Sequence, residues 1–137
     1  MAHFKWNDNY NIGFKLIDDQ HKILISIIND LYDAQRHGLL QSTISETLDK
    51  LSDYTVYHFS YEKELFAQHA YPKAAEHLEE HDYFVDKVKD LQLELSKGSI
   101  VLSLKTMDFL KDWTITHILG SDKEFGEFVK QRELGLE

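Results

Sequence analysis

Four stretches of this chain carry mainly apolar residues at alternating spacings of three and four, and no other feature of the sequence limits the fold as strongly. Residues three and four apart lie on one face of an α-helix, and such a stripe is typical of helices that pack at a shallow angle. One proline and 6 glycines among 137 residues leave few positions that would interrupt these helices. The pattern predicts an all-α protein. The first stripe runs Ile17, His21, Leu24, Ile28 and Leu31.

Short connections join the four stretches, which predicts an up-down-up-down antiparallel four-helix bundle. A chain of 137 residues has the length of one domain, so we expect a single domain over residues 1–137. An irregular N-terminal arm over residues 1–17 would precede the bundle. The stripes place the four helices at about residues 18–37, 43–67, 72–97 and 99–132.

Local signals at the helix starts support these bounds. Asp18 or Asp19 suits the N-cap of the first helix, and Pro72 suits the first turn of the third. Thr43 and Glu46 form a capping-box pattern on the second. The arm carries aromatic and apolar side chains, and we interpret it as a strap against the bundle. These side chains are Phe4, Trp6, Tyr10, Ile12 and Phe14.

Charge and composition exclude several classes of function. The formal net charge of −9 argues against a nucleic-acid partner and against docking on an anionic membrane. No apolar run approaches the roughly 20 residues of a membrane-spanning helix, and the N-terminus has no apolar core of a signal peptide, so we expect a cytoplasmic protein. The chain has no cysteine, so any metal ion would have nitrogen and oxygen ligands.

Histidine and glutamate occupy positions where the stripes should be apolar. Six of these groups have Leu, Ile, Val or Phe as neighbours on the same stripe. A buried carboxylate or charged imidazole without a partner costs several kcal/mol, so roughly six of them would consume the net stability of an ordinary domain. A metal cluster would compensate this cost. The six residues are His21, His58, Glu62, His77, His81 and His117.

The spacing within the stripes supports a metal site. His58 and Glu62 are four residues apart, as are His77 and His81, so each pair lies on one helix face. One such pair is a weak signal, because two histidines at this spacing occur in many metal sites. Two pairs together with two further inward histidines are much more specific.

The stripe of the fourth helix slips by one residue after His117. Asp122 follows His117 by five residues, and Phe125 and Val129 then continue at spacings of three and four. One extra residue inside a helix forms a π-bulge, often at a functional site, and Gly120 would ease it here. We predict a π-bulge that turns Asp122 inward as the seventh polar group.

Seven ligands exceed the four that a zinc ion takes and suit two six-coordinate ions such as iron. Such a pair offers about twelve coordination positions. Five imidazoles, two bridging carboxylates and one oxo or hydroxo bridge leave one position open, where dioxygen would bind. Bundle-type di-iron oxidases use Glu-x-x-His motifs, and this chain has none, which favours binding over oxidation.

Several segments resemble the hemerythrin family, and most closely its bacterial members. The resemblance covers almost the whole chain, and together the segments are highly specific. They are Trp6 and Ile12-Gly13 in the arm, I-D-D-Q-H ending at His21, H-F-S-Y-E from His58, Y-P from Tyr71, H-L-E-E-H from His77, and H-I-L-G-S-D from His117 to Asp122.

This resemblance implies a role for each position. The cofactor would be two iron ions, Fe2+ or Fe3+, with an oxo or hydroxo bridge. Glu62 and Asp122 would bridge both ions, and His21 and His58 would hold the ion with the open position. The other ion would be held by His77, His81 and His117.

The surroundings of the oxygen position are predicted from helical spacing. Thr114 lies one turn before His117, and its hydroxyl group would hydrogen-bond a bound ligand or admit water. The apolar lining would come from Leu24, Ile25, Phe59, Trp113, Ile118 and Leu119. We interpret His3, His37 and His69 as surface or loop residues, and the charged residues around Glu79–Glu80 as a solvated face.

The leading hypothesis is reversible dioxygen binding for storage, transport or delivery, with any oxidase or peroxidase chemistry as a weak side activity. A sensor of oxygen, nitric oxide or redox state is the first alternative. Besides dioxygen as ligand, the expected partner is an oxygen-consuming or signalling protein. A di-iron enzyme such as a peroxidase, ferroxidase or nitric oxide reductase is less favoured, because Glu-x-x-His is absent. Iron storage fits one fixed site poorly.

Overall fold

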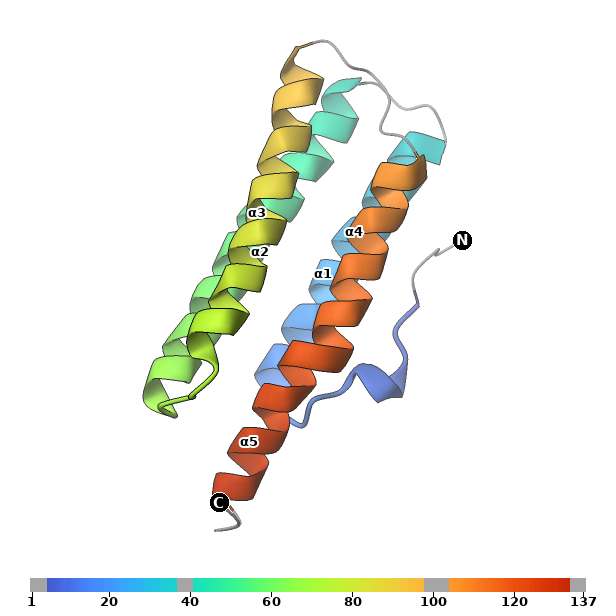
Figure 1. Cartoon of the computed structure of the whole chain (residues 1–137). Coiled ribbons are helices and arrows are strands. Elements are labelled where there is room, and N and C mark those ends of the chain that lie inside the picture. The colour runs from blue at the N-terminus through green and yellow to red at the C-terminus, as the bar shows by residue number, and fades with distance from the viewer. Residues whose placement is uncertain (1–4, 37–40, 98–103, 134–137) are drawn as a thin grey trace.

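The structure is a computed structural model that describes residues 5–36, 41–97 and 104–133. Four helical rods pack antiparallel, which confirms the predicted all-α bundle (Figure 1). The first three rods are α1 (Lys15–Arg36), α2 (Gln41–Gln68) and α3 (Ala74–Ser96). The fourth consists of α4 (Leu104–His117), the π-helical turn η2 (Ile118–Asp122) and α5 (Lys123–Glu133).

The helix starts differ from those predicted, because their side chains make other contacts. Helix α1 begins three residues early, and Asp18 is no N-cap: its Oδ1 accepts a hydrogen bond from the backbone N–H of Ile12, 2.8 Å away. Asp19 instead pairs with Lys15 at 2.9 Å. The capping box at Thr43 is wrong, because α2 already begins at Gln41.

The turn between α2 and α3 explains why Pro72 lies before α3 and not in its first turn. Ala70 has a positive φ of 49°, and the N–H of Tyr71 donates to the carbonyl of Phe66 at 3.0 Å. This pair of features ends α2 as a left-handed C-cap does. Pro72 and Lys73 follow this turn, and α3 begins only at Ala74. The predicted bounds at residues 37 and 99 lie outside the described residues.

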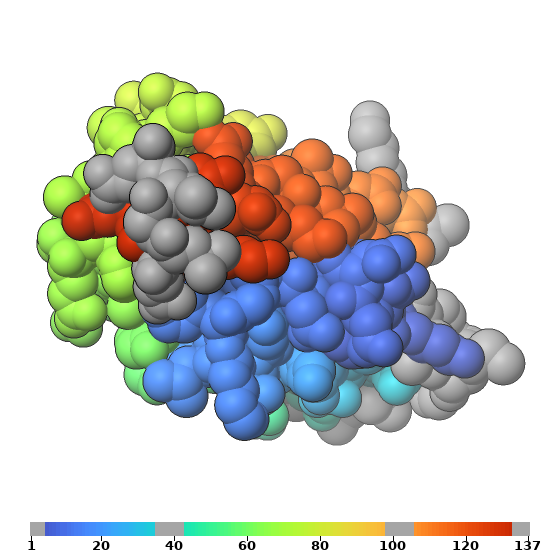
Figure 2. All heavy atoms as spheres, turned by 90° about the horizontal axis from the view of Figure 1, so that it is seen from below, coloured from blue at the N-terminus to red at the C-terminus, as the bar shows by residue number. Residues whose placement is uncertain are grey.

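The N-terminal arm lies against the fourth rod and α1, as predicted for a strap. Its short helix η1 (Asp8–Tyr10) contacts η2, and Figure 2 shows the blue arm against the orange surface of the fourth rod. Ile12 is buried, and a Cβ at Gly126 would collide with the Ile12 carbonyl oxygen. Gly13, at φ 88°, lets the chain turn into α1. Phe4 lies outside the described residues.

Two apolar clusters fill the bundle, with a polar layer between them. The larger cluster includes Leu24, Phe84 and Ile118. The smaller one includes Ile17 and Phe125. Along each helix, the inward histidines and carboxylates fall between members of the two clusters. None of the described helices is long and apolar enough to cross a membrane.

Candidate metal centre

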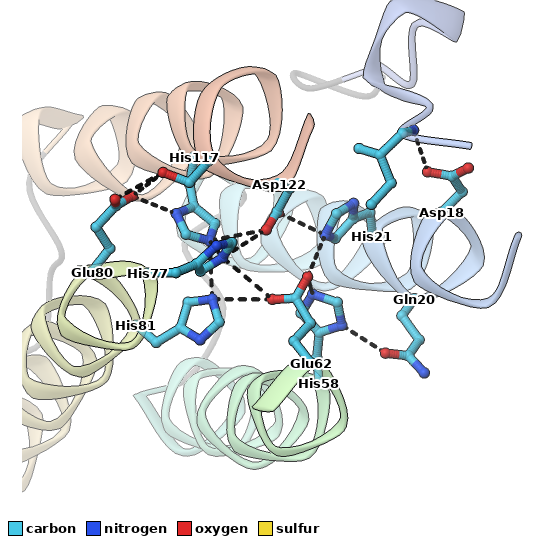
Figure 3. A network of polar contacts seen from close by, with 12 residues as sticks. Asp18, Gln20, His21, His58, Glu62, His77, Glu80, His81, His117 and Asp122 are labelled. Carbon is cyan, nitrogen blue, oxygen red and sulfur yellow. Dashed lines mark hydrogen bonds and ion pairs between the residues drawn. The ribbon is translucent and has the colours of Figure 1, made fainter. Parts of the chain in front are cut away.

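All seven predicted polar side chains meet in the middle of the bundle (Figure 3). Each of the four rods contributes at least one, so the cluster exists only in the folded chain. Each residue is at most 5% exposed to solvent. The seven are His21 from α1, His58 and Glu62 from α2, His77 and His81 from α3, His117 from α4 and Asp122 from η2.

Asp122 directs its two carboxylate oxygens towards different histidines. Oδ1 lies 2.9 Å from Nε2 of His77 and 3.3 Å from Nε2 of His117. Oδ2 lies 3.0 Å from Nε2 of His21, on the other side of the bundle core. The carboxylate therefore stands between two groups of imidazoles.

Glu62 divides its oxygens in the same way. Oε1 lies 3.0 Å from Nε2 of His81 and 3.9 Å from that of His77. Oε2 lies 3.6 Å from Nε2 of His58 and 3.9 Å from that of His21. We call His77, His81 and His117 the three-histidine side, and His21 and His58 the two-histidine side. Both carboxylates span the two sides.

Hydrogen bonds among the histidines cannot satisfy all the ring nitrogens of the three-histidine side. Nε2 of His117 lies 3.0 Å from Nε2 of both His77 and His81. A ring nitrogen offers either one proton or one lone pair, so Nε2 of His117 can form a well-aligned hydrogen bond in only one of these two contacts. A cation at the point where the three nitrogens converge would satisfy all of them.

The carboxylate oxygens also lack hydrogen bonds. Among the described residues, none of the four oxygens of Glu62 and Asp122 has a hydrogen-bond partner, although imidazole nitrogens lie close by. A buried polar atom left unsatisfied in this way costs about 1–3 kcal/mol. Nitrogen and carboxylate ligands that converge without hydrogen bonds fit a bound metal ion.

Burial sets the protonation of the cluster. Burial and the neighbouring Asp122 raise the pKa of Glu62 well above its ordinary value. Burial lowers the pKa of His58 to about 3 and also lowers that of His81, so both imidazoles are neutral at pH 7. Neutral imidazole is the form that binds metal. For His117, Asp122 and Glu80 outweigh burial and raise the pKa to about 9.

The predicted π-bulge is confirmed. Residues 118–122 form a π-helical turn, and Asp122 is 1% exposed. A regular α-helix would turn by about 500° over the five residues from His117 to Asp122, which is about 140° past one full turn. The wider π turn removes this offset, so both side chains face the core. The interrupted stripe in the sequence was the signal of this turn.

Two outer hydrogen-bond partners were not predicted. Gln20 Oε1 lies 2.6 Å from Nδ1 of His58. Glu80 Oε1 lies 2.9 Å from Nδ1 of His117, so Glu80, although partly exposed as expected for a solvated face, also bonds a buried histidine. Glu80 lies three residues after His77, but this spacing carries no signal of its contact with His117.

Only some of the residues predicted to line the oxygen position are buried. Leu24, Ile25, Phe59 and Ile118 are buried, whereas Leu119 is 41% exposed and does not belong to a buried lining. Leu119 follows His117 by two residues, which is about 200° around a helix, so its side chain points away from the core.

The aromatic residues of this set cover the three-histidine side. The ring of Phe59 stacks on that of His81 with centroids 3.7 Å apart, and Trp113 stacks on His117 at 4.6 Å. They therefore shield this side, whereas the predicted open position lies on the other.

The hydroxyl proton of Thr114 is used within its own helix. Oγ1 donates to the carbonyl of Leu110 at 2.7 Å, which leaves only lone pairs for a ligand. Thr55 is also buried, and its hydroxyl group has no partner among the described residues. Thr55 lies one turn before His58 and was not among the predicted site residues.

The remaining histidines stand apart from the cluster. His69 lies in the turn after α2, where its ring contacts Phe14 and Phe125 edge-on. His3 and His37 lie outside the described residues.

Comparison with known proteins identifies close relatives of this arrangement. Residues 12–129 match the family profile described as Hemerythrin HHE cation binding domain. Bacteriohemerythrin from Stenotrophomonas maltophilia is 35% identical over 131 residues, which cover 95% of this chain and 84% of the relative. Bacteriohemerythrin from Methylococcus capsulatus is 37% identical over 116 residues, covering 85% and 86%. A crystal structure of wild-type hemerythrin aligns with a TM-score of 0.86 at 33% identity, covering 92% of this chain and 97% of that one.

Proposed function

The chain belongs to the hemerythrin family, and on this premise we propose that it binds dioxygen reversibly at two iron ions inside the bundle. One observation carries the proposal: Glu62 and Asp122 each direct one oxygen to the three-histidine side and the other to the two-histidine side. Carboxylates placed between two nitrogen-rich positions suit a pair of metal ions better than a single one.

The residues divide between the two ions as their geometry suggests. His77, His81 and His117 would hold one ion. His21 and His58 would hold the other, and Glu62 and Asp122 would bridge them together with an oxo or hydroxo group. When bound and reduced, the two irons supply two electrons and a position for a small ligand on one ion.

The protein's contribution is to keep the site dry and two of its imidazole ligands neutral. The apolar clusters on both sides of the polar layer exclude bulk water. Burial keeps His58 and His81 unprotonated at neutral pH, so no proton competes with the metal for their Nε2 atoms. A dry site limits the supply of protons from water, which favours release of oxygen over its further reduction. We therefore propose a carrier rather than an enzyme.

The test is an oxygen titration of the iron-loaded chain. The protein is reduced under argon, exposed to air and purged with argon while its visible absorption is recorded. The proposal predicts charge-transfer bands that appear with oxygen and disappear on purging over repeated cycles. Bands that decay irreversibly would favour a sensor or an enzyme, and no response at all would exclude oxygen binding.

Matched histidine variants separate the cluster from the rest of the chain. His21→Ala should abolish the bands, because it removes one of the two imidazoles on the two-histidine side. His69→Gln should retain them, because this histidine lies outside the cluster. Equal loss in both variants would contradict the assignment.

A further inference from the structure

Glu80 connects the candidate metal centre to the surface. Its Oε1 lies 2.9 Å from Nδ1 of His117, on the side of the ring opposite the cluster. The side chain of Glu80 is 44% exposed, whereas that of His117 is 4% exposed. The pair therefore joins a solvent-accessible carboxylate to a buried imidazole.

Ser121 holds this carboxylate in place. Its Oγ lies 2.7 Å from Oε1 and 2.8 Å from Oε2 of Glu80, so the hydroxyl donates to the carboxylate (Figure 3 shows Glu80 and His117). Ser121 belongs to the π-helical turn that also brings Asp122 into the core. One irregular turn thus supplies both an inward carboxylate and an outer clamp on Glu80.

The other histidines of the cluster lack a charged outer partner. His58 is hydrogen-bonded to the neutral amide of Gln20. The Nδ1 atoms of His21, His77 and His81 have no hydrogen-bond partner among the described residues. Within the described part of the chain, a carboxylate therefore bonds the outer nitrogen of His117 alone, on the three-histidine side.

We propose that Glu80, clamped by Ser121, is a positioning residue that makes the three-histidine side the tighter of the two iron positions. This inference rests on the proposed di-iron site. The carboxylate accepts the Nδ1 proton of His117 as a hydrogen bond, which fixes the tautomer whose Nε2 lone pair faces the cluster. Its negative charge makes that imidazole a stronger electron donor, whereas Gln20 can orient His58 but adds no charge.

The exposure of Glu80 sets the size of the effect. Loss of an outer partner of a metal ligand lowers metal affinity by about 10–100-fold. Glu80 faces a small surface cavity of about 80 Å³, which Lys73, Glu76 and Glu124 also line. Solvent screens this partly exposed carboxylate, so we expect an effect near the lower end of that range, about 10-fold.

The experiment follows iron release from the iron-loaded chain. The reduced protein is mixed under argon with an excess of a coloured ferrous chelator, and the absorbance gives the rate for each iron. In Glu80→Ala, one of the two irons per chain should leave about 10-fold faster, with the other unchanged. Ser121→Ala should change the same iron in the same direction but less. Gln20→Ala is the matched control, and it should accelerate the other iron.

Glu80→Gln separates charge from orientation, because it retains an acceptor for the Nδ1 proton. We expect a release rate between those of the wild type and Glu80→Ala, and a Mössbauer spectrum in which the signal of only one iron shifts. A merely structural role would not shift one iron signal selectively. Full recovery in Glu80→Gln would overturn the role of charge, and equal acceleration of both irons in Glu80→Ala would overturn the whole inference.

The outcomes also distinguish this inference from the proposed function. A wild type that retains two irons and fails to bind oxygen reversibly, with Glu80→Ala still selective, would refute the function and support the role of Glu80. Reversible oxygen binding with identical iron release in wild type and Glu80→Ala would support the function and refute the role of Glu80.

Discussion

Replacing Gly126 with alanine should displace the N-terminal arm from helix α5. A Cβ at this position would collide with the carbonyl oxygen of Ile12, and it would also lie 3.2 Å from the carbonyl carbon and the Cβ of Ile12. Two of these three contacts are with backbone atoms, so a side-chain rotation cannot relieve them. The arm must move.

The structure gives the magnitude of this displacement. Moving Ile12 exposes a side chain whose burial contributes about 1.5–3 kcal/mol. It also weakens the hydrogen bond from the N–H of Ile12 to the buried Asp18 carboxylate, an interaction of about 1.5–3 kcal/mol. The higher helix propensity of alanine offsets about 1 kcal/mol. Partial relaxation of the arm recovers part of the remaining loss, so we expect the free energy of unfolding to fall by about 2–4 kcal/mol.

The assay is urea unfolding of the iron-loaded protein, with Gly120→Ala as the matched control. Gly120 lies in the same helical rod, but a Cβ there would meet nothing within 4 Å. The free energy of unfolding of the control should change by at most about 1 kcal/mol, whereas Gly126→Ala should lower the unfolding midpoint by about 1–2 M urea. Since η1 contacts η2, which carries Asp122, Gly126→Ala should also release iron faster. Equal stability of the two variants would refute the role of the arm.

Three further predictions follow from local contacts. Thr114→Val should leave the autoxidation rate of the oxygenated protein nearly unchanged, because the hydroxyl proton of Thr114 is already donated to the carbonyl of Leu110. Thr55→Val should change this rate, because the hydroxyl group of Thr55 has no partner among the described residues. The decay of the visible absorption bands measures the rate in each variant. In the metal-free protein, His58 has a pKa of about 3 when folded and about 6.5 when unfolded, so the unfolded state binds more protons between these values. The contribution of His58 to the free energy of unfolding should therefore fall by about 1.4 kcal/mol per pH unit as pH drops from 6.5 towards 3, in urea titrations at stepped pH. Ala70→Gly should raise the free energy of unfolding by up to about 1 kcal/mol, because φ at Ala70 is 49°; a lower melting temperature would contradict this.

The sequence was informative where periodicity determines the structure. The alternating stripes predicted four packed helices, and the same stripes predicted that His21, His58, His77, His81 and His117 would meet in one cluster. The five-residue gap before Asp122 predicted the π turn, because an inward carboxylate at that spacing requires an extra residue. That these side chains hold iron stays a proposal.

Contacts between segments distant in sequence could not be predicted in this way. Asp18 looked like a helix cap, but its carboxylate holds the arm through Ile12, and only the folded arm creates that contact. Glu80 looked solvated, because nothing local shows that Ser121 and His117 approach it across the bundle. The placement of Leu119 in the lining was wrong for a different reason: it lies two residues after His117, about 200° around the helix, and therefore faces outward.

The central claim is that one buried cluster holds two metal ions between shared carboxylates. Anomalous diffraction at the iron edge, from crystals of the iron-loaded protein, tests it most directly. We predict two iron peaks inside the bundle, one next to His77, His81 and His117 and the other next to His21 and His58, with Glu62 and Asp122 in contact with both. A single peak, or iron bound only at surface carboxylates, would contradict the account.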